Sequence, residues 1–175
     1  MTLLLQMTES DVSRITSRIW LGSIHATYDE AWLRATGITH VVTALEIPHT
    51  TPAMRAMGCK QLYVPIHDHP SEPIYLWFQQ TYDFIQTAID SSPDHRVYVH
   101  CMAGISRSST LLAAYLMLRH NATTDDAIAF IRGGRSHINP NPGFYSSLKL
   151  WELHTTRAVA RAAAVKELKE TAPTE

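Results

Sequence analysis

The sequence has little of what marks several special classes of protein. Only two of its 175 residues are cysteines, Cys59 and Cys101, so it does not indicate a disulfide framework, and a reducing compartment is expected. Its 15 Lys and Arg nearly balance its 16 Asp and Glu, and a chain without a basic excess is not expected to bind nucleic acid. There is no sustained apolar run and no basic region of a secretory signal, so membrane insertion is not expected either. We therefore expect a globular protein of the cytoplasm, or also of the nucleus.

Residues 97–110, which read VYVHCMAGISRSST, are the most informative stretch that is present. Val97-Tyr98-Val99 is a β-prone run, and the apolar residues that follow Ser108 repeat at helical spacing. Unpaired backbone N–H groups and the positive end of a helix dipole converge where such a loop meets a helix, so the pattern predicts an anion site. Cys101 lies in that field, which favours the thiolate, the nucleophilic form of the side chain.

Strand patterns alternate with helix patterns along the chain, which predicts an α/β fold with a mostly parallel or mixed sheet covered on both faces. No linker or repeat divides it, so we expect one catalytic domain over residues 12–157, between a lead-in at 1–11 and a helical or flexible tail at 158–175. Pro48 and Pro52 are expected to keep residues 47–58 irregular. Strands are predicted at 12–15, 18–21, 38–45, 59–66 and 97–99, and helices at 28–35, 75–89, 107–120, 124–134 and from about 144. Thr124 is expected to be the cap of the helix at 124–134.

The central stretch has the residues that a thiolate would need to cleave a phosphate ester. Cys101 would be the nucleophile, and Arg107 would hold two phosphoryl oxygens with its planar fork. Gly104 permits close backbone approach, and Ser108 is placed to hydrogen-bond the sulfur and help it leave. An inert, buried cysteine before a helix is the alternative. The substrate-binding loop is expected to consist of Met102, Ala103, Gly104, Ile105, Ser106 and Arg107.

Residues 100–108, HCMAGISRS, resemble the signature loop of the cysteine-dependent protein phosphatases, specifically of their dual-specificity branch. Residues 18–23, 37–42 and 140–144 resemble further segments of that branch, and no kinase-docking domain precedes them, so a small, atypical member is expected. The resemblance implies a central mixed sheet of about five strands flanked by helices on both faces, as in protein tyrosine phosphatases. It also implies metal-independent hydrolysis of phosphotyrosine and phosphoserine or phosphothreonine through a cysteinyl-phosphate, without a cofactor. Phosphorylated proteins, signalling kinases among them, would be the partners, and the oligomeric state stays open.

The family also uses a general acid on the loop after the strand that ends near Ile66, and Asp68 lies there. Glu72 and Asp83 are the alternatives. Histidines flank Asp68 on both sides, but their spacing is not typical of a zinc site, so no metal is expected. His100 is expected to brace the loop, and Asn141 either fixes the loop or starts the last helix. Cys59 is expected in the core, and its pairing with Cys101 stays open.

Three other functions were weighed against catalysis by a thiolate. A serine hydrolase requires G-x-S-x-G, whereas Ser108 stands where the second glycine should be. A sulfurtransferase also places a cysteine loop against a helix, but the Ser-Arg-Ser ending and the Asp68 loop fit phosphatases better. An inactive phosphopeptide-binding module would be expected to lack the cysteine, the arginine or the acid. The loop has no lysine, which argues against a phosphoinositide substrate.

Overall fold

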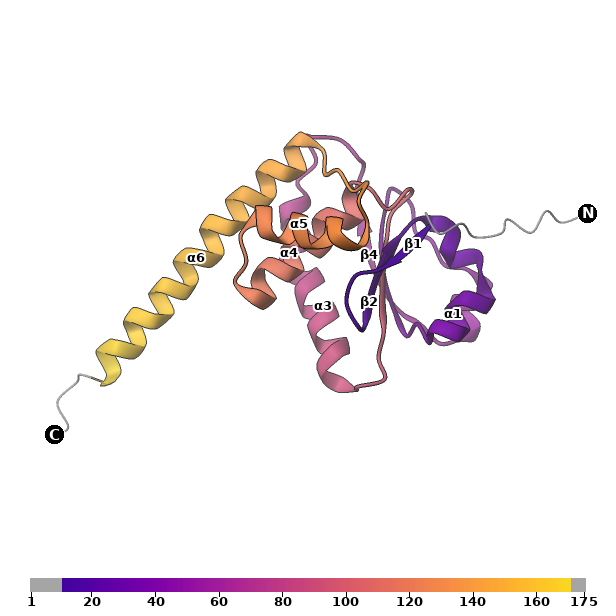
Figure 1. The fold of residues 1–175 in the computed structure, drawn as a ribbon, viewed down its shortest axis with the longest axis horizontal. Coiled ribbons are helices and arrows are strands. Elements are labelled where there is room, and N and C mark those ends of the chain that lie inside the picture. The colour runs from indigo at the N-terminus through magenta and orange to yellow at the C-terminus, as the bar shows by residue number, and fades with distance from the viewer. Residues whose placement is uncertain (1–10, 171–175) are drawn as a thin grey trace, which may run out of the picture.

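A five-stranded mixed sheet forms the centre of the computed structural model, which describes residues 11–170, with side chains as far as Thr156 (Figure 1). The strand order is β1-β2-β5-β3-β4. β1 runs antiparallel to β2, and the other neighbouring strands are parallel. The mixed sheet and its five strands are as predicted. The strands are β1 (Val12–Arg14), β2 (Ile19–Gly22), β3 (His40–Leu45), β4 (Lys60–Pro65) and β5 (Val97–His100).

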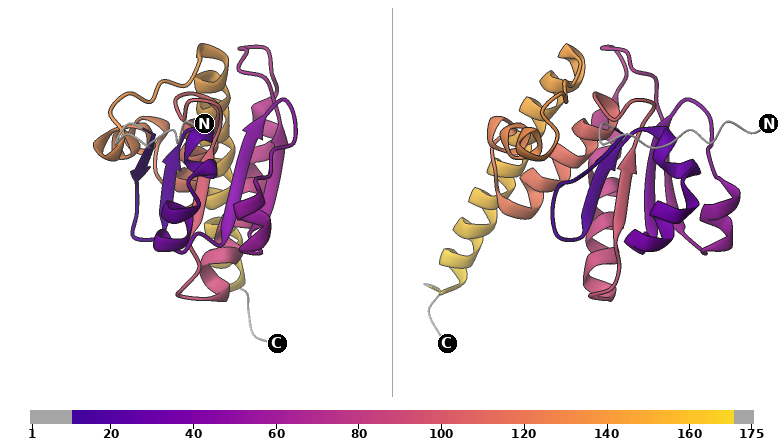
Figure 2. Two further views of the ribbon diagram at one scale, coloured as in Figure 1. Left: turned by 90° about the vertical axis from the view of Figure 1, so that its right-hand side faces the viewer. Right: turned by 45° about the vertical axis from the view of Figure 1, so that its right-hand side comes forward.

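Helices cover both faces of the sheet, as expected (Figures 1 and 2). The larger core lies between the sheet and four helices, and it includes Val42, Val99, Phe78 and Leu112. These helices are α3 (Phe78–Ser91), preceded by the 3-10 turn η2 (Ile74–Trp77), α4 (Arg107–His120), α5 (Thr124–Gly134) and α6 (Pro142–Glu170). A smaller core, which includes Tyr98, lies on the other face. The elements there are the 3-10 turn η1 (Ile24–Tyr28), α1 (Glu30–Thr36) and α2 (Pro52–Ala56).

The helix α2 corrects the expectation that residues 47–58 are irregular. Thr51 caps the helix, because its Oγ1 accepts a hydrogen bond from the Met54 amide at 3.3 Å. Pro52 occupies the first turn, where its missing N–H has no partner to lose and its fixed φ suits a helix. Pro52 therefore starts this helix rather than breaking it. A smaller correction concerns α5, whose cap is Thr123 and not Thr124, the cap predicted from the sequence.

α6 packs against the body with one face and then extends away from the body (Figure 1). Phe144 and Leu148 on this face are fully buried. The backbone of the expected tail is helical as far as Glu170. Its side chains and residues 171–175 lie outside the described residues, as do residues 1–10 of the expected lead-in. Within the described part of the chain, no helix is both long and apolar enough to cross a membrane.

The sheet brings the chain's loops together at one edge. β5 lies between β2 and β3, and His100 at its end is level with Gly22 and Thr43. All four parallel strands end at this edge, which is where open α/β sheets place their sites. α4 starts there, and from Arg107 to Met117 every residue of it is buried.

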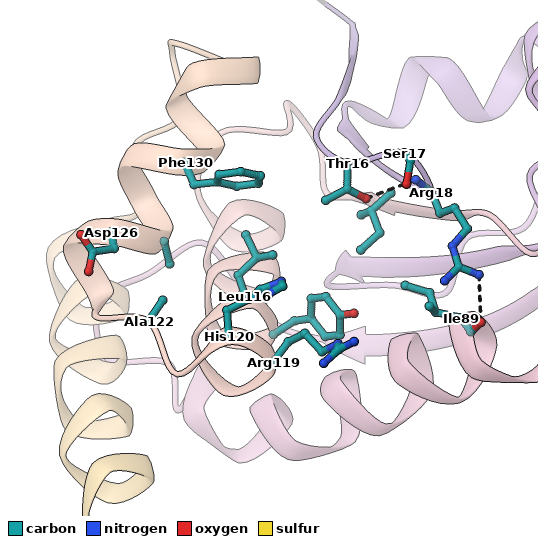
Figure 3. A pocket seen from close by; sticks show the side chains of 13 residues that line it. Thr16, Ser17, Arg18, Ile89, Leu116, Arg119, His120, Ala122, Asp126 and Phe130 are labelled. Atoms are coloured by element: carbon teal, nitrogen blue, oxygen red, sulfur yellow. Dashed lines mark hydrogen bonds between the residues drawn. The ribbon is translucent and has the colours of Figure 1, made fainter. Parts of the chain in front are cut away.

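The other end of α4 borders a cavity of about 450 Å³. Leu116 on α4 and Phe130 on α5 face it, and Arg18 reaches from the start of β2 to the carbonyl of Ile89 (Figure 3). The lining is mainly apolar, and no candidate residue from the sequence lies in it.

Candidate active site

Cys101 lies directly after β5, at the start of the loop that leads into α4. Its side chain is 2% exposed. The sulfur accepts hydrogen bonds from the Gly104 amide at 3.3 Å and from Ser108 Oγ at 3.2 Å. A negative charge on the sulfur would therefore be met by two donors, one of them the predicted serine.

Gly104 is required by both conformation and space. Its φ is +70°, a region that L side chains rarely adopt. A Cβ built on it would lie 2.4 Å from the carbonyl carbon of Gly22 at the end of β2. The loop therefore folds against β2 more closely than any side chain at this position allows.

The carbonyl groups of the loop are bound by partners outside it. Arg135, a buried residue after α5, donates from Nε to the Gly104 carbonyl at 2.9 Å and from Nη2 to the Ala103 carbonyl at 3.1 Å. The Asn139 amide donates to the Ile105 carbonyl at 2.9 Å. Among the described residues, no hydrogen-bond partner is found for the amides of Ala103, Ile105 and Ser106. Fixed carbonyls and uncommitted amides are what an anion-binding loop requires.

Arg107 is held at the base of the loop by an acidic residue that the sequence reasoning missed. Its Nη1 donates to Glu46 Oε1 at 2.8 Å and to the Ile66 carbonyl at 3.2 Å. Its Nε is buried and has no hydrogen-bond partner among the described residues, with Asp68 Oδ2 as far as 3.8 Å away. A buried N–H without a partner costs free energy, so this donor is suited to an anion in the loop. Glu46 follows β3 directly, a position that could have marked it.

Asp68 reaches the loop from the end of β4. Its Oδ1 accepts hydrogen bonds from Ser106 Oγ at 2.7 Å and from Asn141 Nδ2 at 2.9 Å. The side chain is 36% exposed, so one of its oxygens can meet a substrate. The alternative Asp83 instead pairs with Gln79 on the exposed face of α3. No contact of the Glu72 side chain with the loop is found among the described residues.

Asn141 both contacts the loop and caps the last helix, the two roles that were predicted as alternatives. Its side-chain Nδ2 donates to Asp68 Oδ1, and its backbone amide donates to Ser106 Oγ at 3.1 Å. Its Oδ1 accepts from the Phe144 amide at 3.0 Å, which caps the first turn of α6. The start of α6 is thus tied to the acid and to the loop at once.

The sequence and the fold of this chain are similar to those of known proteins. Residues 19–154 match the family model described as the dual specificity phosphatase catalytic domain. The chain belongs to the dual specificity phosphatase family. The resemblance seen in the sequence is therefore confirmed.

Single relatives agree with this family. The dual specificity protein phosphatase 26 of Homo sapiens is 39% identical over 132 residues, which are 74% of this chain and 62% of that protein. The chain thus spans less than two thirds of that relative's length. The crystal structure of human DUSP28 has a TM-score of 0.76 and 27% identity, and the match covers 83% of this chain and 95% of that one. Human tyrosine phosphatase-like serine/threonine/tyrosine-interacting protein has a TM-score of 0.75 and 30% identity, with 82% and 97% covered.

His100 braces the loop of this family member from beneath. It is fully buried, with Nε2 2.9 Å from Thr43 Oγ1 and Nδ1 3.3 Å from the Cys101 carbonyl oxygen. The pKa of His100 is lowered to about 3, mainly by burial; the hydrogen bond to Cys101 opposes the shift and the nearby His49 adds to it. The ring is therefore neutral at neutral pH, which suits a bracing role and not proton transfer.

The register of the strands excludes a disulfide between the two cysteines within one chain. Both are free. Lys60 and Val97 are both level with His40, so Cys59 and Cys101 are five positions apart along the strands. Five positions span about 16 Å, whereas a disulfide needs Cα atoms within about 7 Å. Cys59 Sγ instead donates to the Ile38 carbonyl at 3.3 Å, and burial raises the pKa of its thiol.

The histidines around Asp68 do not form a metal centre with it. His69 Nδ1 lies 2.8 Å from Ser71 Oγ, and His67 Nδ1 lies 3.8 Å from Glu46 Oε1. Within the described part of the chain, no three His, Cys, Asp or Glu side chains come together in a way that could hold a metal ion.

Proposed function

We propose that this chain is a protein phosphatase that hydrolyses phosphotyrosine and phosphoserine or phosphothreonine esters through a cysteinyl-phosphate intermediate. The observation that carries the proposal is that Cys101 and Arg107, at the two ends of one loop, are joined by Asp68 from the segment after β4. Family membership supports this reaction class, and phosphorylated proteins, including signalling kinases, are the proposed substrates.

In the first step the Cys101 thiolate attacks phosphorus, so that an S–P bond forms and the P–O bond to the substrate breaks. Protonated Asp68 donates its proton to the leaving oxygen, which departs as the alcohol or phenol. Arg107 Nε and the amides of the loop bind the nonbridging oxygens, and they stabilise the charge of the transition state.

In the second step water attacks phosphorus, and the Asp68 carboxylate accepts a proton from it. The S–P bond breaks, and its electron pair returns to the Cys101 sulfur. The hydrogen bond of Ser108 Oγ to this sulfur, at 3.2 Å, stabilises the departing thiolate. Inorganic phosphate leaves, and Asp68 is again protonated for the next cycle. The two steps need no metal ion.

A second candidate function is binding of phosphopeptides without hydrolysis. The similarity to the interacting protein named above favours it. The complete set of nucleophile, arginine and acid in this chain favours hydrolysis instead.

The decisive experiment compares the wild type with Cys101→Ser on an aryl phosphate in the presence of a chelator. We expect kcat to fall by at least about 1,000-fold, because the step that forms the intermediate loses its nucleophile. Thermal unfolding of the variant is the control for its folding. Activity that survives the substitution, or that the chelator alone abolishes, would contradict the proposal.

A further inference from the structure

Three large apolar side chains are exposed on segments that adjoin the Cys101 loop. Tyr28 is 64% exposed, Ile47 is 71% exposed and Met102 is 50% exposed. They come from η1, from the segment between β3 and α2, and from the loop itself. Exposed apolar groups that gather at one place are typical of interaction sites. These three residues are called the apolar rim below.

Met102 and Ile47 are fixed beside the reacting groups. Met102 follows Cys101, and its carbonyl accepts a hydrogen bond at 3.1 Å from the amide of Ile24, the first residue of η1. The first residue of η1 therefore lies beside the loop. Ile47 follows Glu46, whose carboxylate binds Arg107 at 2.8 Å.

Tyr28, at the other end of η1, is tied to the same region through His49. The two rings meet edge to face with centroids 5.4 Å apart. His49 in turn lies 5.8 Å from the ring of His100, the residue before Cys101. Its Nε2 is 2.7 Å from Thr27 Oγ1, which fixes the position of the His49 ring. Met102 thus belongs to the loop, Ile47 follows a residue that binds Arg107, and Tyr28 is linked to the loop through the rings of His49 and His100.

We propose that the apolar rim binds nonpolar residues that flank the phosphorylated residue of a substrate protein. This inference rests on the proposed phosphatase function and specifies its substrate. The loop supplies the donors for a single phosphoryl group, while Met102, Ala103 and Ile105 add no positive charge for a second one. The nearby carboxylate of Glu46 is about one-third exposed. Its negative charge disfavours acidic flanking residues by repulsion of like charges.

Three phosphotyrosine peptides test the proposal. They are identical except that both residues next to phosphotyrosine are Leu, Ala or Asp. We expect kcat/KM to be about tenfold higher for the Leu peptide than for the Ala peptide, as partial burial of one or two Leu side chains implies. We expect the lowest value for the Asp peptide.

Matched variants assign the preference to the rim. In Ile47→Ser the ratio of the Leu to the Ala peptide is expected to fall to about 2 or less. Leu150→Ser removes an apolar side chain of similar exposure (66%) from α6 and is expected to keep the wild-type ratio. A ratio unaffected by Ile47→Ser would overturn the assignment.

The same peptides separate failure of this inference from failure of the proposed function. Equal rates on all three peptides, with the aryl phosphate hydrolysed normally, would overturn the rim and leave the phosphatase intact. If the wild type hydrolyses neither the peptides nor the aryl phosphate, the proposed function fails. Calorimetric affinities of Cys101→Ser for the peptides then decide the inference, which requires tighter binding of the Leu peptide and is overturned by equal affinities.

Discussion

The two ends of α4 differ in chemistry although they belong to one buried helix. At its start, Arg107, Ser108, Ser109 and Thr110 are all buried. The hydroxyl groups of the two serines and the threonine are hydrogen-bonded. Thr110 Oγ1, for example, donates to the Ser106 carbonyl at 2.8 Å. At its end, Leu116 faces a cavity of about 450 Å³ with an apolar lining (Figure 3). The first end presents directed hydrogen-bond donors to the loop, whereas the second end borders a mainly apolar cavity.

The helix dipole accounts for part of this difference. The positive end of α4 meets the loop, where a phosphate would bind. The negative end is matched by a cation, because Arg119 lies in the last turn. Arg18 donates to the carbonyls of Ile89 and Ser92, at 2.9 and 3.1 Å, and so serves the end of α3. A cavity alone does not make a binding site, since the cationic side chains around this cavity already interact with the ends of helices.

After Cys101→Ser, Asp68→Asn is the substitution with the largest expected effect, and it acts at the start of α4. Without the acid, the leaving oxygen must depart unprotonated. On an alkyl or phenyl phosphate we expect kcat to fall by about 10²- to 10⁴-fold. On a substrate with an activated leaving group the loss should be only a few-fold. Steady-state kinetics on the two substrates measure the contrast, and equal losses on both would move the acid to another residue.

Two glycines give a matched comparison of the loop with an exposed helix surface. In Gly104→Ala the new Cβ would meet the Gly22 backbone at 2.4 Å, so the loop must shift. We expect kcat/KM to fall by about 100-fold, because small misplacements of reacting groups have effects of that size.

Gly133→Ala is the control for Gly104→Ala, because nothing lies within 4 Å of the new Cβ in α5. It should keep its activity and stabilise the fold by about 0.5–1 kcal/mol. Kinetics and urea unfolding of both variants measure these effects. A Gly104→Ala variant as active as Gly133→Ala would show that the close approach to β2 is dispensable.

Two buried histidines at opposite ends of the strands make the fold sensitive to acid. Burial lowers the pKa of His100 to about 3 and, together with His95 and Lys60, that of His40 to about 4. An unfolded histidine has a pKa near 6.5, so below that pH the unfolded chain binds more protons than the folded chain. Stability is therefore lost as pH falls, by about 2 kcal/mol for each histidine at pH 5.

Urea unfolding at pH 7 and pH 5 measures this loss. In His40→Gln, the difference in unfolding free energy between the two pH values should shrink by about 2 kcal/mol, because one of the two groups is gone. A wild type equally stable at both pH values would contradict the burial of two neutral histidines.

The sequence predicted the parts of the site that are contiguous in it. Cys101, Gly104, Arg107 and Ser108 lie within eight residues, so one strand–loop–helix pattern fixes their relation. Asp68 needed the family resemblance, because a lone aspartate on a loop has no distinctive pattern.

Glu46 and Arg135 were missed for the same physical reason. They act on the loop across 61 and 31 positions of the chain, through contacts that only the folded sheet creates. The fold was predicted well where strand patterns and helix patterns alternate clearly along the chain. The prediction was wrong at Pro52, because a rule about helix interiors was applied to the start of a helix.

Substitution of Arg135 is expected to have a smaller effect on catalysis, because this residue acts on the reacting groups only through the loop. Arg135→Gln loses at least one of the two hydrogen bonds to the carbonyls of Ala103 and Gly104, so these carbonyl groups are held less firmly in position. We expect a fall in kcat of about tenfold, since one charge-assisted hydrogen bond is worth about 1.5–3 kcal/mol and only part of it bears on the transition state. Arg119→Gln, the same change at the apolar end of α4, should leave kcat within about twofold, because exposed charges there contribute little. If both variants behaved alike, the carbonyls would need no partner, and the loop would hold its shape by its own hydrogen bonds.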